Sequence, residues 1–381
     1  MSRNALLRQW IHVCSARRVL LLGACAGALS LAARAPLSAQ PGHGAPTNDT
    51  PAATTSPAAE SFSTFRSPTR ARVVIVEDPH ATEAFKPRSE RVAAMLARGL
   101  TALTGKASVH EAWFSLVSTQ DVIGLRVFST PGPDAGTRPD VVRAIARGLL
   151  DIGVPAHHIV IWDKSERDLR DAGFVELARE LGVRCVGSAE AGYDPEHFYE
   201  QPLIGTLVWS DLEFGQKGEG VGRRSYVSRL LTREVTRIIN VPPLQNHRLA
   251  GVTGNLYGLA MASVDNTLRF ERDAGRLAQA VPEIYALPEV GDRVVLNIVD
   301  ALLCQYEGGP RGLLHYSTVL NQLRLSRDPV ALDVLSLREL ERQRRAARMP
   351  FVKPNLELYR NAELLELGVS DPDRIAVETL R

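Results

Sequence analysis

The chain has 381 residues, 45% hydrophobic and 23% charged, which suffices for one large domain or about two of ordinary size. Its 45 Lys and Arg slightly exceed its 43 Asp and Glu, but five of the arginines lie within the first 39 residues, which contain no acid. The remaining 40 basic and 43 acidic residues leave a charge of −3, so the mature chain lacks the basic footprint of a nucleic-acid-binding protein.

Residues 1–39 are typical of an export signal, with a basic start, an uncharged apolar run from Val19 to Ala33 and small residues before position 40. The run is shorter than the roughly 20 residues that a membrane-spanning helix needs. Arg17-Arg18 followed by Val-Leu-Leu favours a twin-arginine signal, with a Sec signal as the alternative. We expect a periplasmic or extracellular protein without a transmembrane helix in its mature chain; the alternative is a lipid anchor at Cys25.

Residues 40–69 are rich in Pro, Ala, Ser, Thr and Gly and contain few large apolar side chains. Such a segment buries too little surface to offset the entropy of ordering it, so we predict a disordered linker. The folded region then covers residues 70–381. A division into two lobes, 70–190 and 235–381, stays open.

Apolar runs and helical periodicity alternate in the first half of this region. Strands are expected over 72–76, 121–128, 158–162 and 183–186, and helices over 86–103, 137–153 and 165–181. Strands joined by helices over short connections indicate a mostly parallel sheet with right-handed crossovers. The predicted fold class is α/β, with helices flanking the sheet.

The most unusual stretch is 237–270. A buried strand, 238–241, ends at two prolines and is followed by a polar turn, Gln245-Asn246-His247, a glycine-rich segment and a helix over 256–264. Ligands usually bind beyond the carboxyl ends of strands in such folds, so we expect a composite site here. The second half is expected to contain strands over 293–299 and 317–325 and helices over 328–345 and 355–367.

Three residues are candidates for catalysis. His247 is a titratable group in a turn after a strand, although a surface histidine is the plain alternative. Asp300 follows the apolar run 293–299, and Glu307 precedes Gly-Gly-Pro in the next loop. Two carboxylates near a strand end could act as a base or bind a divalent cation.

Four further residues are candidates for ligand binding. Asn246, Asn255 and Asn266 supply neutral donors and acceptors, although Asn is also an ordinary turn residue. Asp333 lies among apolar residues on the helix that Asp328-Pro329 begins, so a buried acid there needs a partner. The Arg and Glu residues of 338–348 alternate on that helix and indicate a solvated face.

Two weaker patterns indicate what is absent. The glycine-rich segment 215–222 is neither a Walker A nor a dinucleotide fingerprint, so a loop is favoured over a phosphate cradle. The mature chain keeps only Cys185 and Cys304, too few for the four thiolates of an iron–sulfur cluster, and no Cys/His spacing matches a zinc site. Whether these two cysteines pair stays open.

A set of segments spans nearly the whole folded region: 122–127, 159–163 with 169–174, 239–247, 249–254, 297–301, 326–333 and 362–373. These segments resemble one family, known as domain of unknown function 362, whose members are often exported and sometimes carry ferredoxin-like clusters. The family pattern tends to have Lys where this chain has Arg126 and Gln245. Because Arg126 keeps the charge, it is a further candidate for ligand binding.

The residues do not define a reaction. One hypothesis is an enzyme that acts on a small polar or anionic substrate through His247 with Asp300 or Glu307, with a divalent cation as an option. The others are a non-catalytic protein that binds a small ligand and a structural protein of the envelope. The sequence leaves the substrate and the oligomeric state open.

Overall fold

The computed structural model describes residues 70–201 and 222–381. The predicted export signal, the predicted linker and most of the glycine-rich segment 215–222 lie outside the described residues. In the part of the chain that the structure describes, no helix is both long enough and apolar enough to cross a membrane.

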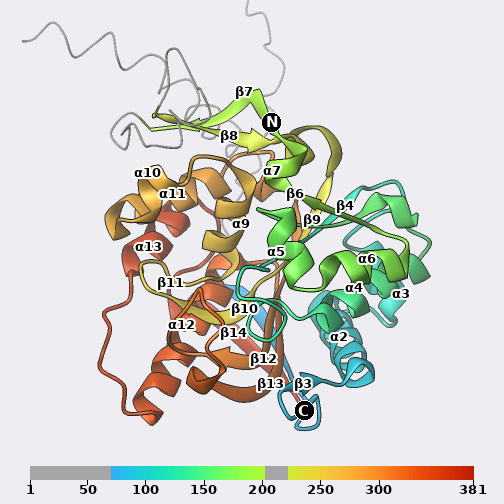
Figure 1. Ribbon diagram of the computed structural model, residues 1–381. Coiled ribbons are helices and arrows are strands. Elements are labelled where there is room, and N and C mark those ends of the chain that lie inside the picture. Colours follow the sequence, from blue (N-terminus) through green and yellow to red (C-terminus); the bar gives the residue numbers. More distant parts are fainter. Residues whose placement is uncertain (1–69, 202–221) are drawn as a thin grey trace, which may run out of the picture.

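A ten-stranded sheet forms the centre of the fold (Figure 1). Eight strands follow the order β14-β1-β13-β12-β9-β4-β5-β6, and β10 and β11 extend from β12. All neighbours are parallel except the pairs made by β13 and the pair β10–β11, which confirms the predicted α/β class with a mostly parallel sheet. The strands are β1 (Ala71–Glu77), β4 (Ile123–Val127), β5 (Ile159–Asp163), β6 (Arg184–Gly187), β9 (Arg237–Val241), β10 (Pro243–His247), β11 (Gly251–Val252), β12 (Val294–Gln305), β13 (Ser317–Ser326) and β14 (Ile375–Leu380). Two small hairpins lie apart from the sheet: β2 (Thr82–Glu83) with β3 (Lys86–Pro87), and β7 (Tyr193–Glu200) with β8 (Arg224–Ser228).

Helices cover both faces of the sheet and form two cores. Because successive side chains of a strand point to opposite faces, Ile238 of β9 joins one core and Ile239 the other. The core of Ile239 packs against the cyan and green helices of Figure 1: α2 (Ser89–Thr104), α3 (Val109–Phe114), α4 (Pro139–Asp151), α5 (Glu166–Asp171) and α6 (Phe174–Leu181). The core of Ile238 packs against the yellow to red ones: α9 (Asn255–Ser263), α10 (Leu268–Glu271), α11 (Ala274–Tyr285), α12 (Pro329–Ala346) and α13 (Leu356–Leu364). The one-turn helix α7 (Ser188–Ala191) follows β6.

Side-chain caps begin some of the helices. Asp328 caps α12 as expected, since its Oδ1 accepts a hydrogen bond from the Ala331 N–H at 2.8 Å and Pro329 is the first helical residue. Thr137 does not cap α4: its hydroxyl donates to the carbonyl of Val241 and accepts from the Phe128 N–H at 2.9 Å. The expected helix over 165–181 is two helices, because Gly173 between them takes a positive φ of 83°.

The structure differs from the sequence-based expectation at two polar segments. Gln245, Asn246 and His247 form part of strand β10 rather than a turn, because β10 pairs with β12 and β11. Strand β12 does not end before Asp300 but continues to Gln305. Helix α11 and strand β14 were not predicted. The cysteines are both unpaired, Cys185 on β6 and Cys304 on β12, and burial raises the pKa of each thiol to about 12.

Helix α9 starts on a carboxylate from another helix. Asp333 of α12 is buried, and its oxygens accept hydrogen bonds from the backbone N–H groups of Asn255 at 2.7 Å and Leu256 at 3.0 Å. The side-chain amide of Asn255 donates to the same carboxylate at 2.8 Å. Gly254, just before α9, has room only for hydrogen, because a Cβ there would lie 2.4 Å from Asp333 Oδ1. Asp333 thus joins α12 to the amino terminus of α9.

We expect Asp333→Asn to destabilise the fold. The side-chain amide of the new Asn carries an NH₂ group in place of one carboxylate oxygen. This NH₂ group would face the N–H donors of Asn255 and Leu256 and could not accept from them, so buried N–H groups would lose their partner at a cost of about 1–3 kcal/mol or more. Urea unfolding of the variant measures this loss. The matched control is Asp373→Asn, since Asp373 is exposed; equal stability of the two variants would contradict the capping role.

Candidate functional site

A cavity of about 870 Å³ lies beside strand β10. It is bounded by the β10–β11 turn, the loop that follows β12, helix α12, the segment 349–355 and the start of α13. This is where the stretch 237–270 meets the loop that follows Gln305, the last residue of β12. Three of the candidate residues line it: Asn246, His247 and Glu307.

Hydrogen bonds hold the two loops of this pocket together. Asn246 Oδ1 accepts from the Gly309 N–H at 3.0 Å, which joins β10 to the loop after β12. Gln305 Nε2 donates to the carbonyls of Glu307 at 3.0 Å and Arg311 at 2.7 Å, and its Oε1 accepts from the Leu313 N–H at 3.0 Å. One side chain therefore fixes both ends of that loop.

His247 is held as a neutral ring. Its Nδ1 accepts hydrogen bonds from the backbone N–H groups of Ala250 at 3.0 Å and Leu249 at 3.4 Å, and its ring lies on that of Tyr257 with centroids 4.2 Å apart. Burial lowers the pKa of His247 from its ordinary value of 6.5 to about 4. Since Nδ1 is an acceptor, the proton of the neutral ring is on Nε2, and His247 offers a hydrogen-bond donor.

The pocket is rich in cations. Arg344 pairs with Glu307, and Arg345 pairs with Glu341. Five more basic side chains line the pocket, and none of them forms an ion pair with any residue of 70–201 or 222–381. They are Arg248, Arg311, Arg338, Lys353 and Arg360.

Asp300 lies elsewhere, in the middle of β12, and is fully buried. Its Oδ1 pairs with Arg138 Nη1 at 3.0 Å and accepts from the Leu302 N–H at 3.2 Å, while its Oδ2 accepts from the Arg138 N–H at 2.9 Å. The structure does not bring Asp300 together with His247 in the pocket. Its contacts tie β12 to the start of α4.

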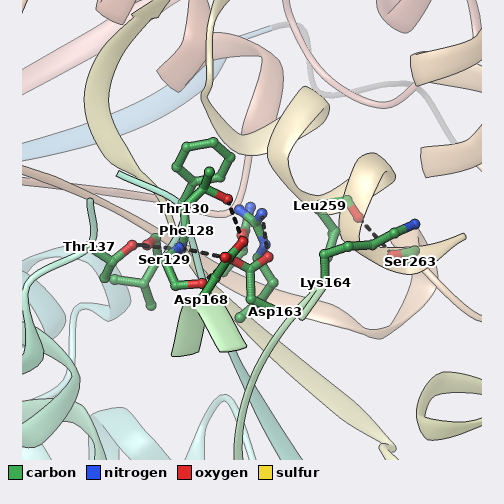
Figure 2. A network of polar contacts seen from close by, with 12 residues as sticks. Phe128, Ser129, Thr130, Thr137, Asp163, Lys164, Asp168, Leu259 and Ser263 are labelled. Atoms are coloured by element: carbon green, nitrogen blue, oxygen red, sulfur yellow. Dashed lines mark hydrogen bonds and ion pairs between the residues drawn. The ribbon is translucent and has the colours of Figure 1, made fainter. Parts of the chain in front are cut away.

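Arg126 belongs to a second polar cluster, at the carboxyl ends of β4 and β5. Its Nη2 lies 3.2 Å from Asp163 Oδ1, and Asp163 Oδ2 accepts from the backbone and hydroxyl of Ser129 at 2.8 and 2.7 Å. Figure 2 shows Ser129 and Asp163 pointing toward one another, with Thr130 donating to Asp168 at 3.1 Å beside them. Burial lowers the pKa of Arg126, and Asp163 opposes this shift.

The remaining candidates serve other contacts. Asn255 and Asp333 bind one another at the start of α9, as described above. Burial raises the pKa of Asp333 to about 7, against the three hydrogen bonds that favour its charged form. Asn266 has a positive φ of 44°, and its Nδ2 donates to the Arg224 carbonyl at 3.3 Å, as a turn residue does.

Sequence reasoning missed the basic side chains of the pocket. Arg338 was expected on a solvated face of its helix, which its exposure fits, but that face lines the cavity. Only the packing of α12 beside β10 could reveal this. Within the described residues, no group of three or more His, Cys, Asp and Glu side chains is arranged to hold a metal ion.

A family model described as "Domain of unknown function (DUF362)" matches residues 125–338, more than half of the chain. The chain belongs to this family, as the resemblance indicated. No curated protein matches the chain. It is similar to the crystal structure of a protein from Thermotoga maritima, at 12% identity and a TM-score of 0.39, over 71% of this chain and 62% of that one.

We expect Asp300→Asn to destabilise the fold without a direct effect on the pocket. Removing the charge of one partner leaves Arg138 buried without its counter-charge, which typically costs about 3–5 kcal/mol. Chemical denaturation measures the loss. Asp134→Asn is the control because Asp134 is exposed, in the segment before α4. A variant as stable as the wild type would show that the Asp300–Arg138 pair contributes little.

We expect His247 to make stability depend on pH. Between about pH 4 and 6.5 the unfolded chain binds a proton at this ring that the folded chain excludes, so stability falls as the pH drops through this window. In His247→Gln this fall should be smaller, by up to about 3 kcal/mol at pH 4. Melting curves from pH 4 to 7 measure this dependence of stability on pH. The control is His110→Gln, because His110 is exposed. Parallel curves for wild type and His247→Gln would contradict the buried neutral ring.

Proposed function

We propose that the protein binds a small anionic ligand in the pocket beside β10. The observation that carries this proposal is the set of five basic side chains without ion-pair partners among the described residues, gathered around one cavity of about 870 Å³. Cavities of roughly 300–1,000 Å³ are the usual size for small-molecule sites.

Electrostatics supports an anion. The chain as a whole carries little net charge, so the positive potential of the pocket is local. Basic side chains outnumber the acids of the lining, which are Glu307, Glu341 and Asp371. A concave surface with an excess of one charge attracts ions of the opposite sign. Arginine is suited to carboxylate and phosphate groups because its guanidinium can donate two parallel hydrogen bonds.

Neutral donors complete the site. His247 offers its Nε2 proton, and its low pKa keeps this group a donor without charge at neutral pH. Asn246 contacts Gly309 through its Oδ1, which leaves the Nδ2 group for a ligand. Both residues lie on a strand, so the position of these donors is fixed by the sheet.

An enzyme is the second candidate. It is favoured by one observation, namely that His247 and Glu307 line the same pocket. Asp300 has no part in it, since it is buried against Arg138. In this hypothesis an anionic substrate binds to the basic side chains, and His247 donates a hydrogen bond to it through Nε2. A divalent cation stays part of the enzyme hypothesis, with no ligands assigned.

We further propose that the protein is exported and meets its ligand in the periplasm or outside the cell. The support is the N-terminal pattern of residues 1–39, with its Arg17-Arg18 pair and apolar run. Attachment to a membrane through a lipid on Cys25 remains the alternative. Fractionation of cells that express the full chain distinguishes these locations.

A titration with anions tests the binding proposal. We expect organic anions to raise the melting temperature, and the double change Arg338→Gln with Arg360→Gln to weaken binding about tenfold or more, since a charge-assisted hydrogen bond contributes about 1.5–3 kcal/mol. Arg179→Gln, on α6 away from the pocket, is the matched control. Absence of any anion effect would overturn the proposal. Consumption of a stabilising anion, abolished by His247→Gln, would favour the enzyme.

A further inference from the structure

The same pocket has an apolar wall. Val334, Leu337 and Leu340 of α12 line one side, and Met349, Pro350, Phe351 and Val352 of the segment after α12 line another. Leu356 at the start of α13 adds to it. The cavity thus combines basic side chains with apolar ones from two segments.

Part of this wall is exposed to a degree that is unusual for such residues. Phe351 is 73% exposed, Val352 51% and Leu356 44%. Single exposed apolar side chains are common on protein surfaces, and Phe114 is one example. Three exposed apolar side chains that line one pocket form a surface whose burial against a ligand would be favourable.

The size of the cavity argues against an inorganic anion as the natural ligand. A water molecule takes up roughly 30 Å³, and phosphate occupies only a few times that volume. Such an ion would contact the basic side chains and leave most of the apolar wall in water. A ligand that fills the site needs an apolar part of its own.

We propose that the ligand is an organic anion in which a carboxylate or phosphate head is joined to an apolar chain or ring system. The proposal deepens the anion-binding function and rests on it. The head binds among Arg248, Arg338 and Arg360, with the Nε2 proton of His247 within the same pocket. The tail lies against α12 and the segment 349–352.

The position of the segment 349–355 supports this arrangement. Its carbonyl at Pro350 accepts a hydrogen bond from Arg344 Nη2 at 2.8 Å, and Asn355 Nδ2 donates to the carbonyls of Leu249 and Ala274 at 3.0 and 2.9 Å. The segment is therefore anchored at both ends while its apolar side chains, Phe351 and Val352, lie between the anchors. A tail that binds here covers these two side chains.

A homologous series of free anions tests the proposal. We expect the affinity of straight-chain carboxylates, measured by calorimetry from butanoate to decanoate below their micelle concentrations, to rise with each added CH₂ by up to about fourfold. Alkyl phosphates of the same lengths should show the same slope. Inorganic phosphate and sulfate, and the neutral alcohol decanol, should each bind far more weakly than decanoate.

Variants of the protein test the contacts to the apolar tail separately from those to the anionic head. Phe351→Ser with Val352→Ser should weaken decanoate binding about tenfold and flatten the dependence on chain length, while leaving butanoate unchanged. Because both side chains are exposed, the fold should tolerate the change. The matched control is Phe114→Ser, on α3 outside the pocket, which should leave all affinities unchanged.

The outcomes are distinct. Anion binding without any dependence on chain length would overturn the amphiphile and leave the anion-binding function standing. Failure of every anion to bind would overturn both. Binding to vesicles of anionic lipid without binding of the free acids would assign the basic and apolar side chains to a membrane surface, and would also overturn the proposal.

Discussion

The pocket depends on one buried interaction, between the carboxylate of Asp333 and the amino terminus of α9. Asp333 lies on α12, and Leu337, one turn further along, lines the pocket. Tyr257 lies on α9 and supports the ring of His247. A hydrogen-bonded contact between two helices therefore links the apolar wall to the neutral donor. Burying the Asp333 carboxylate costs desolvation free energy, which the helix terminus and the hydrogen bonds from three N–H groups offset.

The alternation of strands and helices could be predicted because buried parallel strands and amphipathic helices leave strong periodic signals in the sequence. The start of α12 at Asp328-Pro329 could also be predicted, because an N-cap residue acts on backbone groups within one turn of its own position. Strand β12 was predicted to end too early, at Asp300. A charged residue after an apolar run resembles a strand end, and only the position of Arg138, far away in the sequence, shows that this charge is buried.

The site could be predicted only in part. His247, Asn246 and Glu307 were found because polar residues next to strands and glycines are uncommon without a function or a turn to explain them, and the structure places all three at one pocket. The basic side chains were missed for a physical reason: an arginine on a solvated helix face and an arginine on the rim of a cavity occupy the same sequence pattern. What distinguishes them is the partner across the cavity, which is a property of tertiary packing.

Strand β14 pairs in parallel with β1, and the side chains of Arg72 and Glu378, 306 positions apart, meet across them. This edge of the sheet can form only after residue 380 has left the ribosome. Until then β1 lacks its pairing with β14. Pairings of such long sequence separation form late and slowly. If the export proposed above uses a route that accepts folded proteins, the chain would need to remain in the cytoplasm until this pairing is made.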